Sequence, residues 1–133
     1  MPTVTVPRDR PHLTPGALLD EADALREAGH SLAAGCLVRA ALEATLRDLC
    51  ERHRCTPSMA AKVPPYAVPR TNRYVRALWR RRIIDRRTGN RIKKALEKTN
   101  GPAHGRPMSA DSAARWIAVA RDLLARSEGR AAA

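Results

Sequence analysis

The sequence predicts an all-α protein, an antiparallel up-down bundle of four to five helices, and three observations lead to this prediction. Alanine and leucine dominate and β-branched residues are few, which favours helices over sheets. Apolar residues recur with helical periodicity in several segments. Most of these segments are joined by short links, as in bundles whose neighbouring helices run antiparallel. The length of 133 residues suits one domain with a real core.

The first two helices are expected in the half of the chain before the proline cluster. Thr14 is suited to cap the first helix, with Pro15 in its first turn, and Gly29 should end it. Ser31 is expected to cap a longer second helix that runs to about Arg54. The apolar stripe of the first helix is Leu18, Leu19, Ala22, Leu25 and Ala28. The stripe of the second helix is Leu32, Cys36, Leu42, Leu46, Leu49 and Cys50.

Residues 56–70 form a proline-rich connector, because Pro57, Pro64, Pro65 and Pro69 exclude regular helix over most of it. Thr71 is expected to cap a third helix. In that helix we expect an inward face of Tyr74, Val75, Leu78 and Trp79. Its arginines should lie mostly outward: Arg73, Arg76, Arg80, Arg81 and Arg82.

The last two helices follow without a long connector. Asp85 is expected to cap a fourth helix that ends near Thr99, where Asn100-Gly101-Pro102 should break it. Ser109 or Asp111 should begin the fifth helix. The apolar stripe of the fifth helix is Trp116, Ile117, Ala120, Leu123 and Leu124. The expected organisation is a flexible N-terminal arm (1–13), a single helical domain (14–127) and a flexible tail (128–133).

Targeting signals and cysteines suggest where the protein is located. We expect a cytoplasmic protein with no membrane association, since there is no secretory signal and the longest apolar run, 32–38, is too short to span a bilayer. Three cysteines at irregular spacing indicate reduced thiols. Cys50, His53 and Cys55 form a cluster that suggests zinc, but there is no second pair, so we interpret the cysteines as core thiols. No metal and no other cofactor is expected.

The positive charge lies almost entirely in the second half of the chain. Residues 1–69 carry eight Lys/Arg and eight Asp/Glu, whereas residues 70–133 carry seventeen and five, which accounts for the whole net charge of +12. Such a field attracts polyanions. The alternative is a genome rich in G and C that uses arginine freely at surfaces, but that tendency should not spare the first half.

The fourth helix is predicted to carry a basic ridge, which we define as Arg87, Arg91, Lys94 and Lys98. These residues fall within about 60° of one another around the helix. Like charges in a row repel unless an anion lies against them, and a phosphate backbone is the simplest such partner. Arg80 and Arg81 are expected to add to this nucleic-acid-binding surface. The alternative is a solvated face. A stacking platform for bases is not expected, because Trp79 is predicted to be in the core.

Two motifs carry a resemblance to a known family. The second helix contains R-x-A-L-E, from Arg39 to Glu43, whose two ends can pair on one face. The end of the fourth helix contains N-G-x-A-H, from Asn100 to His104. In this order and spacing the motifs resemble the HEPN superfamily (higher eukaryotes and prokaryotes nucleotide-binding), in particular its prokaryotic branches of uncharacterised domains. The resemblance covers most of residues 14–127.

The resemblance implies a helical bundle, usually a homodimer, and in many members a metal-independent ribonuclease. In such enzymes a histidine assists attack of the RNA 2′-hydroxyl on the phosphodiester while an arginine holds the phosphate. His104 takes the histidine position, Lys98 stands five residues before it where arginine is expected, and Asn100 adds a polar contact. Lysine lacks the planar fork of arginine, which argues for weak or lapsed catalysis. The alternative for His104 is a turn histidine that caps backbone groups.

The function predicted from the sequence is therefore a HEPN-like domain that binds RNA or nucleotide through its basic face. The alternative is a non-catalytic interaction module, an adaptor or toxin–antitoxin component, that binds an acidic protein partner such as an antitoxin. A DNA-binding helical protein ranks last, because there is no clear helix-turn-helix signature.

Overall fold

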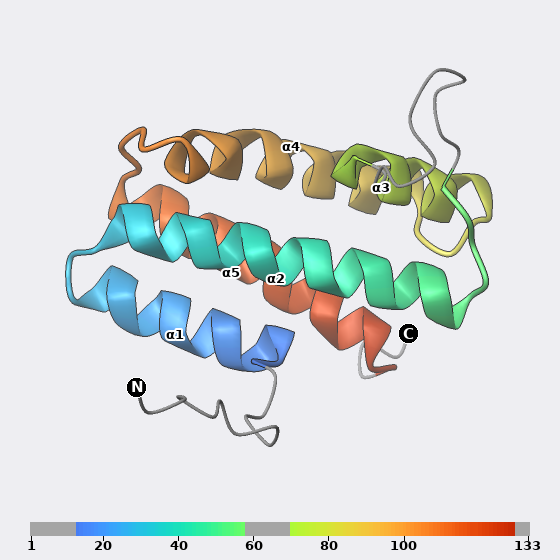
Figure 1. The fold of residues 1–133 in the computed structure, drawn as a ribbon, viewed down its shortest axis with the longest axis horizontal. Coiled ribbons are helices and arrows are strands. Elements are labelled where there is room, and N and C mark those ends of the chain that lie inside the picture. Colours follow the sequence, from blue (N-terminus) through green and yellow to red (C-terminus); the bar gives the residue numbers. More distant parts are fainter. Residues whose placement is uncertain (1–12, 58–69, 130–133) are drawn as a thin grey trace, which may run out of the picture.

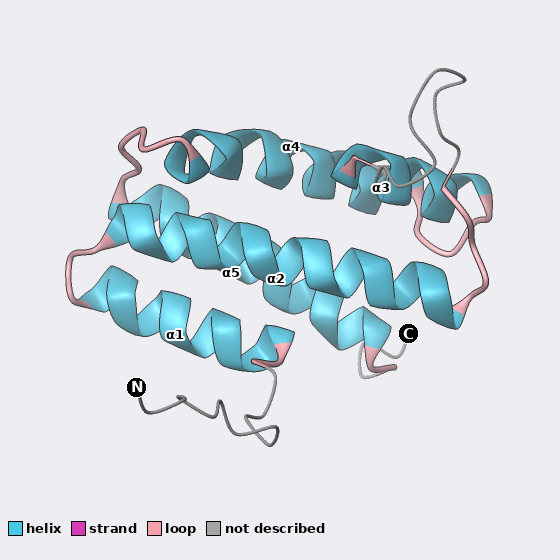
Figure 2. Ribbon diagram, in the orientation of Figure 1, coloured by secondary structure: helices cyan, strands magenta, loops and turns pink. Residues whose placement is uncertain are grey.

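The computed structural model describes residues 13–57 and 70–129. These residues form five helices: α1 (Pro15–Glu27), α2 (Ser31–Arg52), α3 (Thr71–Arg80), α4 (Arg86–Ala103) and α5 (Ala110–Ser127). No strand occurs in the described ranges (Figure 2), so the prediction of an all-α bundle is confirmed. Most of the N-terminal arm, residues 58–69 of the connector and the last four residues lie outside the described residues, and the predictions made for them stay predictions.

The helices are arranged around α2, which contacts all four others. α1 and α4 run in one direction and α2 and α5 in the other (Figure 1). α1 packs on α2 and α5 along one edge of the bundle, while α3 and α4 pack together along the opposite edge. Within the described chain α1 contacts neither α3 nor α4. The two edges are therefore separated by α2 and α5.

Three helices begin at the caps that the sequence predicts. The Thr14 hydroxyl accepts from the Ala17 N–H at 3.1 Å at the start of α1, and Ser109 accepts from the Ser112 N–H at 3.1 Å at the start of α5. The Asp85 carboxylate accepts from the Thr88 N–H at 2.7 Å at the start of α4.

The other two predicted caps are wrong. Ser31 is the first residue of α2, and the residue before it, His30, makes no side-chain cap bond. Thr71 is likewise the first residue of α3, where its hydroxyl donates to Glu43 of α2 at 3.3 Å instead of capping its own helix. Thr71 is thus used for contact between helices.

The predicted apolar stripes largely form the core, with exceptions on α2 and α3 and at the end of α1, where Ala28 is exposed. The fully buried large apolar side chains are Leu19, Val38, Leu42, Leu46, Val75, Leu78, Ile92 and Leu123. Leu32 was predicted to be buried but is 39% exposed, because it lies in the first turn of α2. Cys36 is only partly buried, whereas Cys50 and Cys55 are buried as expected of core thiols. Trp79 was predicted to be inward and is 46% exposed.

α4 extends past its predicted end at Thr99 and reaches Ala103, with Pro102 inside its last turn. Pro102 is buried against Gly35 of α2: a Cβ at Gly35 would lie 2.9 Å from the proline Cγ and 3.0 Å from the Met108 sulfur. The absence of a side chain at Gly35 therefore lets α2 approach the end of α4. Burial of the proline ring compensates for the hydrogen bond that proline cannot donate.

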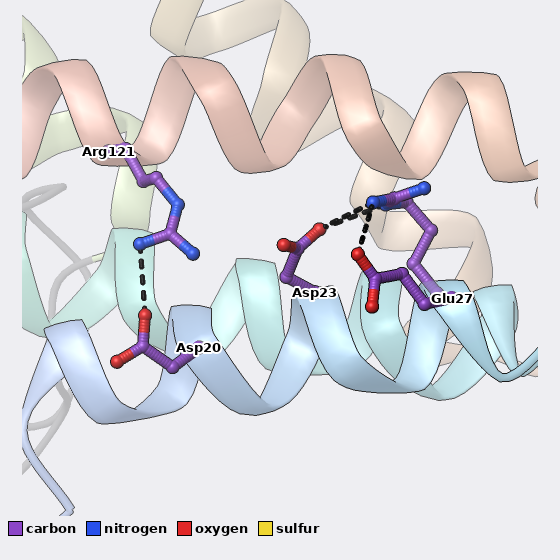
Figure 3. A network of polar contacts seen from close by, with 5 residues as sticks. Asp20, Asp23, Glu27 and Arg121 are labelled. Atoms are coloured by element: carbon purple, nitrogen blue, oxygen red, sulfur yellow. Dashed lines mark hydrogen bonds and ion pairs between the residues drawn. The ribbon is translucent and has the colours of Figure 1, made fainter.

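Charged contacts join α1 to α5 at the opposite edge. Arg121 of α5 donates to Asp20 of α1 at 3.1 Å, and Arg26 pairs within α1 with Asp23 at 2.8 Å and Glu27 at 3.6 Å (Figure 3). None of the helices in the described ranges is long and apolar enough to cross a membrane.

Candidate nucleic-acid interface

The exposed side of α4 carries two polar stripes rather than one. The basic ridge is exposed as predicted. A second stripe lies about 100° around the helix from it, by the rotation of about 100° per residue. Its members are exposed and consist of Arg86, Asn90, Lys93, Glu97 and Asn100. We call this set the second stripe.

The ridge borders a depression of about 590 Å³ beside the start of α5. Three ridge residues line it: Arg87, Arg91 and Lys94. The rest of the lining is Arg115 of α5 with Arg86 and Asn90 of the second stripe. Among the six cations of α4, Arg91 alone forms an ion pair within the described chain, at 3.6 Å to Asp122. The Asp122 carboxylate also pairs with Arg126, at 3.4 Å, so two arginines share it. Most of the ridge charge is therefore not neutralised by neighbouring carboxylates.

A second depression of about 540 Å³ lies where α2, α3 and α4 meet. Arg39 contributes from α2, Arg70 and Asn72 from the start of α3, and Lys93 and Asn100 from α4. Glu97 is the one acidic residue that lines it. This arrangement presents three cations and two amides, which are the groups that bind phosphate oxygens.

The Arg39 guanidinium organises this depression. Its Nε pairs with Glu43 at 3.1 Å, as predicted, and its Nη1 donates to the Leu96 carbonyl at 2.6 Å. The hydroxyl of Thr71 also donates to Glu43. Arg39 is only 23% exposed, so these contacts hold the guanidinium in one orientation. Pre-organisation of this kind reduces the entropy lost when an anion binds.

Between these two depressions lies a third, of about 210 Å³, which was not predicted from the sequence. Val75 and Trp79 of α3 form one wall, and α4 forms the other with Arg86, Gly89, Asn90 and Lys93. It shares Lys93 with the depression around Arg39, and Arg86 and Asn90 with the depression beside the ridge. The three depressions thus adjoin one another along α4.

The second stripe could have been found from the sequence, because its residues recur at helical spacing. The exposure of Trp79 could not have been predicted in this way. Trp79 follows Val75 by four residues, so periodicity places both on the same face. Among the described helices, however, α3 contacts only α2 and α4, and these two helices cover only part of that face. Trp79 is left at the edge of the covered part.

Arg80 and Arg81 do not join the surface along α4. With Arg76 they line a separate depression of about 180 Å³ next to Cys55, near the end of α2. The sequence-based prediction placed these two arginines with the ridge, and the structure separates them from it. Their exposure is as predicted.

The three residues predicted to be catalytic are not gathered in one depression. Asn100 lines the depression around Arg39, whereas Lys98 belongs to the ridge, about 160° away around α4. His104 is the C-cap of α4 and is exposed; its backbone N–H donates to the carbonyls of Asn100 at 3.3 Å and Gly101 at 2.9 Å. These bonds involve the backbone, so they leave the imidazole free of a capping role.

Two groups, one at the start of α4 and one in the core, have shifted pKa values. Hydrogen bonds from the side chain and backbone of Thr88 lower the pKa of the Asp85 carboxyl, and the positive charges of Arg126 and Arg87 lower it further. Burial raises the pKa of the Cys50 thiol to about 12, with a further contribution from Cys55. Within the described ranges, no group of three or more His, Cys, Asp or Glu side chains is placed to hold a metal ion.

Comparisons of the chain with protein-family models, with curated proteins and with solved structures found no match.

Proposed function

We propose that this protein is a HEPN-like domain that binds RNA or nucleotides through the basic surface along α4. The observation that carries the proposal is the lining of the three adjoining depressions. Eight cationic side chains line these depressions, against a single carboxylate, that of Glu97. The cations are Arg39, Arg70, Arg86, Arg87, Arg91, Lys93, Lys94 and Arg115.

This balance favours a polyanion over a neutral ligand. Exposed like charges on one helix face repel, and an anion that bridges them removes that cost. Phosphates fit the lining because arginine forks and amide N–H groups both donate to phosphate oxygens. Openings of this size on a surface suit an extended chain that runs over α4.

The resemblance adds a second line of support. Its two motifs are far apart in the sequence, and one residue from each, Arg39 and Asn100, lines the same depression. Binding does not require the predicted catalytic set to be complete. We therefore propose binding as the function, while cleavage by His104 and self-association stay predictions; sedimentation that shows only monomer at high concentration would contradict self-association.

A salt titration tests the proposal. Binding of a labelled single-stranded RNA, of a DNA duplex and of poly-glutamate should be measured by polarisation at rising salt. For the RNA we expect a linear fall of log affinity with log salt, with about −0.7 for each phosphate neutralised. Failure to bind RNA at low salt would refute the proposal. Binding of poly-glutamate as tight as that of RNA would instead favour an acidic protein partner.

A further inference from the structure

We propose that the Trp79 depression is a stacking site for one base of a single-stranded nucleic acid, with Arg86 and Lys93 holding the phosphates on its two sides. The inference rests on the proposed function and makes it more specific: the occupant is an unpaired strand. It reverses the sequence-based expectation that no stacking platform exists.

The exposed indole is the first observation. A large aromatic side chain that is 46% exposed leaves apolar surface in water unless a ligand covers it. Its surroundings combine an apolar wall, which Val75 forms with Trp79, and a polar wall on α4, which holds Arg86, Asn90 and Lys93. Two cations opposite the ring favour an anionic ligand over a purely apolar peptide. An aromatic ring beside cations is the arrangement by which proteins bind unpaired bases.

The spacing on α4 is the second observation. Arg86, Asn90 and Lys93 follow one another at helical intervals on one face, so Arg86 and Lys93 stand about 10 Å apart along the axis. Asn90 lies between them and has both donors and an acceptor for a base edge. A base against Trp79 would therefore have an amide at its edge and a cation on each side.

The position between the two larger depressions is the third observation. Lys93 also lines the depression around Arg39, and Arg86 also lines the depression beside the ridge. A strand that crosses Trp79 thus meets further cations in both directions. A duplex is disfavoured, because its bases are stacked on one another and offer no free face.

The test compares ligands and variants of the whole chain. The ligands are an oligouridylate of about ten nucleotides, its deoxy counterpart, a duplex and an abasic oligomer of equal length and charge. The variants are Trp79→Ala and Trp79→Phe, with Leu32→Ala as the matched control, because Leu32 is also an exposed apolar residue but lines none of the three depressions.

Trp79→Ala should weaken binding of the oligouridylate by about 5- to 140-fold, the value of one base–aromatic stack. The slope of log affinity against log salt should stay unchanged, because no charge is lost. The abasic oligomer should bind the parent and Trp79→Ala equally, since it has no base to stack. Leu32→Ala should behave as the parent. If the deoxy oligomer binds as tightly as the oligouridylate, the site accepts a strand of either sugar. If it binds less tightly, the site prefers RNA.

Fluorescence gives an independent readout. The chain has two tryptophans, and Trp116 is only 5% exposed, so quenching by a bound base should come from Trp79. Trp79→Phe should keep most of the affinity but lose the quenching. The abasic oligomer and poly-glutamate should not quench the parent.

The outcomes separate the two proposals. If the parent binds RNA with the expected salt dependence and Trp79→Ala binds as tightly, the stacking site is refuted and the proposed function stands. Quenching by poly-glutamate equal to that by RNA, or duplex binding as tight as single-strand binding, also refutes the stacking site. If the parent does not bind RNA at low salt, both proposals fail.

Discussion

The two edges of the bundle carry opposite charge, and they differ in how far their charges are paired with one another. α1 has four carboxylates and one arginine, whereas α4 has six cations and one carboxylate. On the α1 edge, Arg26 is paired twice and Asp20 is bonded to Arg121 (Figure 3). Among the six cations of α4, Arg91 alone is in an ion pair within the described chain. A net charge of +12 therefore describes a molecule with one compensated edge and one uncompensated edge.

The contrast in charge between the two edges indicates where a partner should approach. Charges that are paired internally contribute to the fold and add little to the long-range field. Unpaired cations of α4 attract a polyanion, whereas the largely paired charges of the α1 edge contribute little to the field. The uneven distribution of charge over the molecule thus directs an incoming polyanion toward α4.

The largest expected effect concerns chemistry on the α4 edge. If His104 assists cleavage of RNA, His104→Ala should lower the rate by about 10²- to 10⁴-fold and leave binding and stability nearly unchanged, because the imidazole of this exposed C-cap carries none of the backbone bonds. Gel analysis of a panel of RNAs measures this rate. Products should end in a 2′,3′-cyclic phosphate and EDTA should have no effect. Lys98→Arg should raise the activity, since it restores a planar fork.

The cleavage prediction has a clear negative result. If neither the parent nor the Lys98→Arg variant cuts any RNA of the panel, His104 has no catalytic role and the chain binds without cutting.

The next effect tests the charge contrast itself. Changing Arg87, Arg91 and Lys94 together to Gln should weaken RNA binding by about two orders of magnitude near 0.1 M salt and flatten its salt dependence, since three phosphate contacts are lost. Polarisation titrations measure both quantities. The matched control is Arg26→Gln with Arg121→Gln on the other edge, which should leave RNA binding unchanged. Equal affinity of the triple variant and the parent would make the ridge a solvated face.

A third change tests the close packing of α2 against the end of α4. Gly35→Val should lower the free energy of unfolding by about 1–3 kcal/mol, because the added atoms overlap the ring of Pro102 and the Met108 side chain. Gly16→Ala is the control: its Cβ would lie 3.7 Å from Leu124, an ordinary contact. Urea denaturation distinguishes the two. Equal stability of Gly35→Val and the parent would show that the helices separate there at no cost.

A fourth prediction concerns pH. The raised pKa of Cys50 means that the folded state favours the neutral thiol. This contribution to stability is present below pH 9 and is lost as the pH rises toward about 12, because the unfolded chain then releases a proton that the folded chain retains. The parent should therefore lose more stability over this window than Cys50→Ala does. Cys36→Ala should follow the parent, and a parallel loss in Cys50→Ala would contradict the prediction.

The smallest effect lies on the compensated edge. Asp20→Asn should change the free energy of unfolding by about 0–1 kcal/mol, since its pair with Arg121 is largely exposed. The effect should decline further as salt screens the pair. A loss of several kcal/mol in thermal or urea unfolding would mean that this edge depends on its ion pairs more than exposed pairs allow.

The sequence predicted the helices well wherever local rules decide. Thr14, Asp85 and Ser109 cap helices because their side chains act within one turn, and the core stripes follow from periodicity. Predictions failed where tertiary contacts override local ones. Thr71 gives its hydroxyl to Glu43 on another helix, and α4 passes through Pro102 because the ring is buried on Gly35. Neither partner could be inferred from nearby residues.

The candidate site was predicted in part for the same reason. The ridge is a property of one helix, so its exposure follows from spacing alone. The depression around Arg39 requires three helices to meet, and the exposure of Trp79 depends on which helices cover α3. The motifs pointed to Arg39 and Asn100 separately, but only the packing of α2 on α4 brings them to the same depression.

The contact of Gly35 with Pro102 has a consequence for sequence variation. The two positions share one small volume, so a side chain can be added at 35 only if the residue at 102 becomes smaller. Chains that diverge from this one while keeping the fold should therefore vary at these two positions together. Substitution of Pro102 by Ala should likewise restore part of the stability that Gly35→Val removes. The last turn of α4, which precedes His104, should therefore vary together with the start of α2.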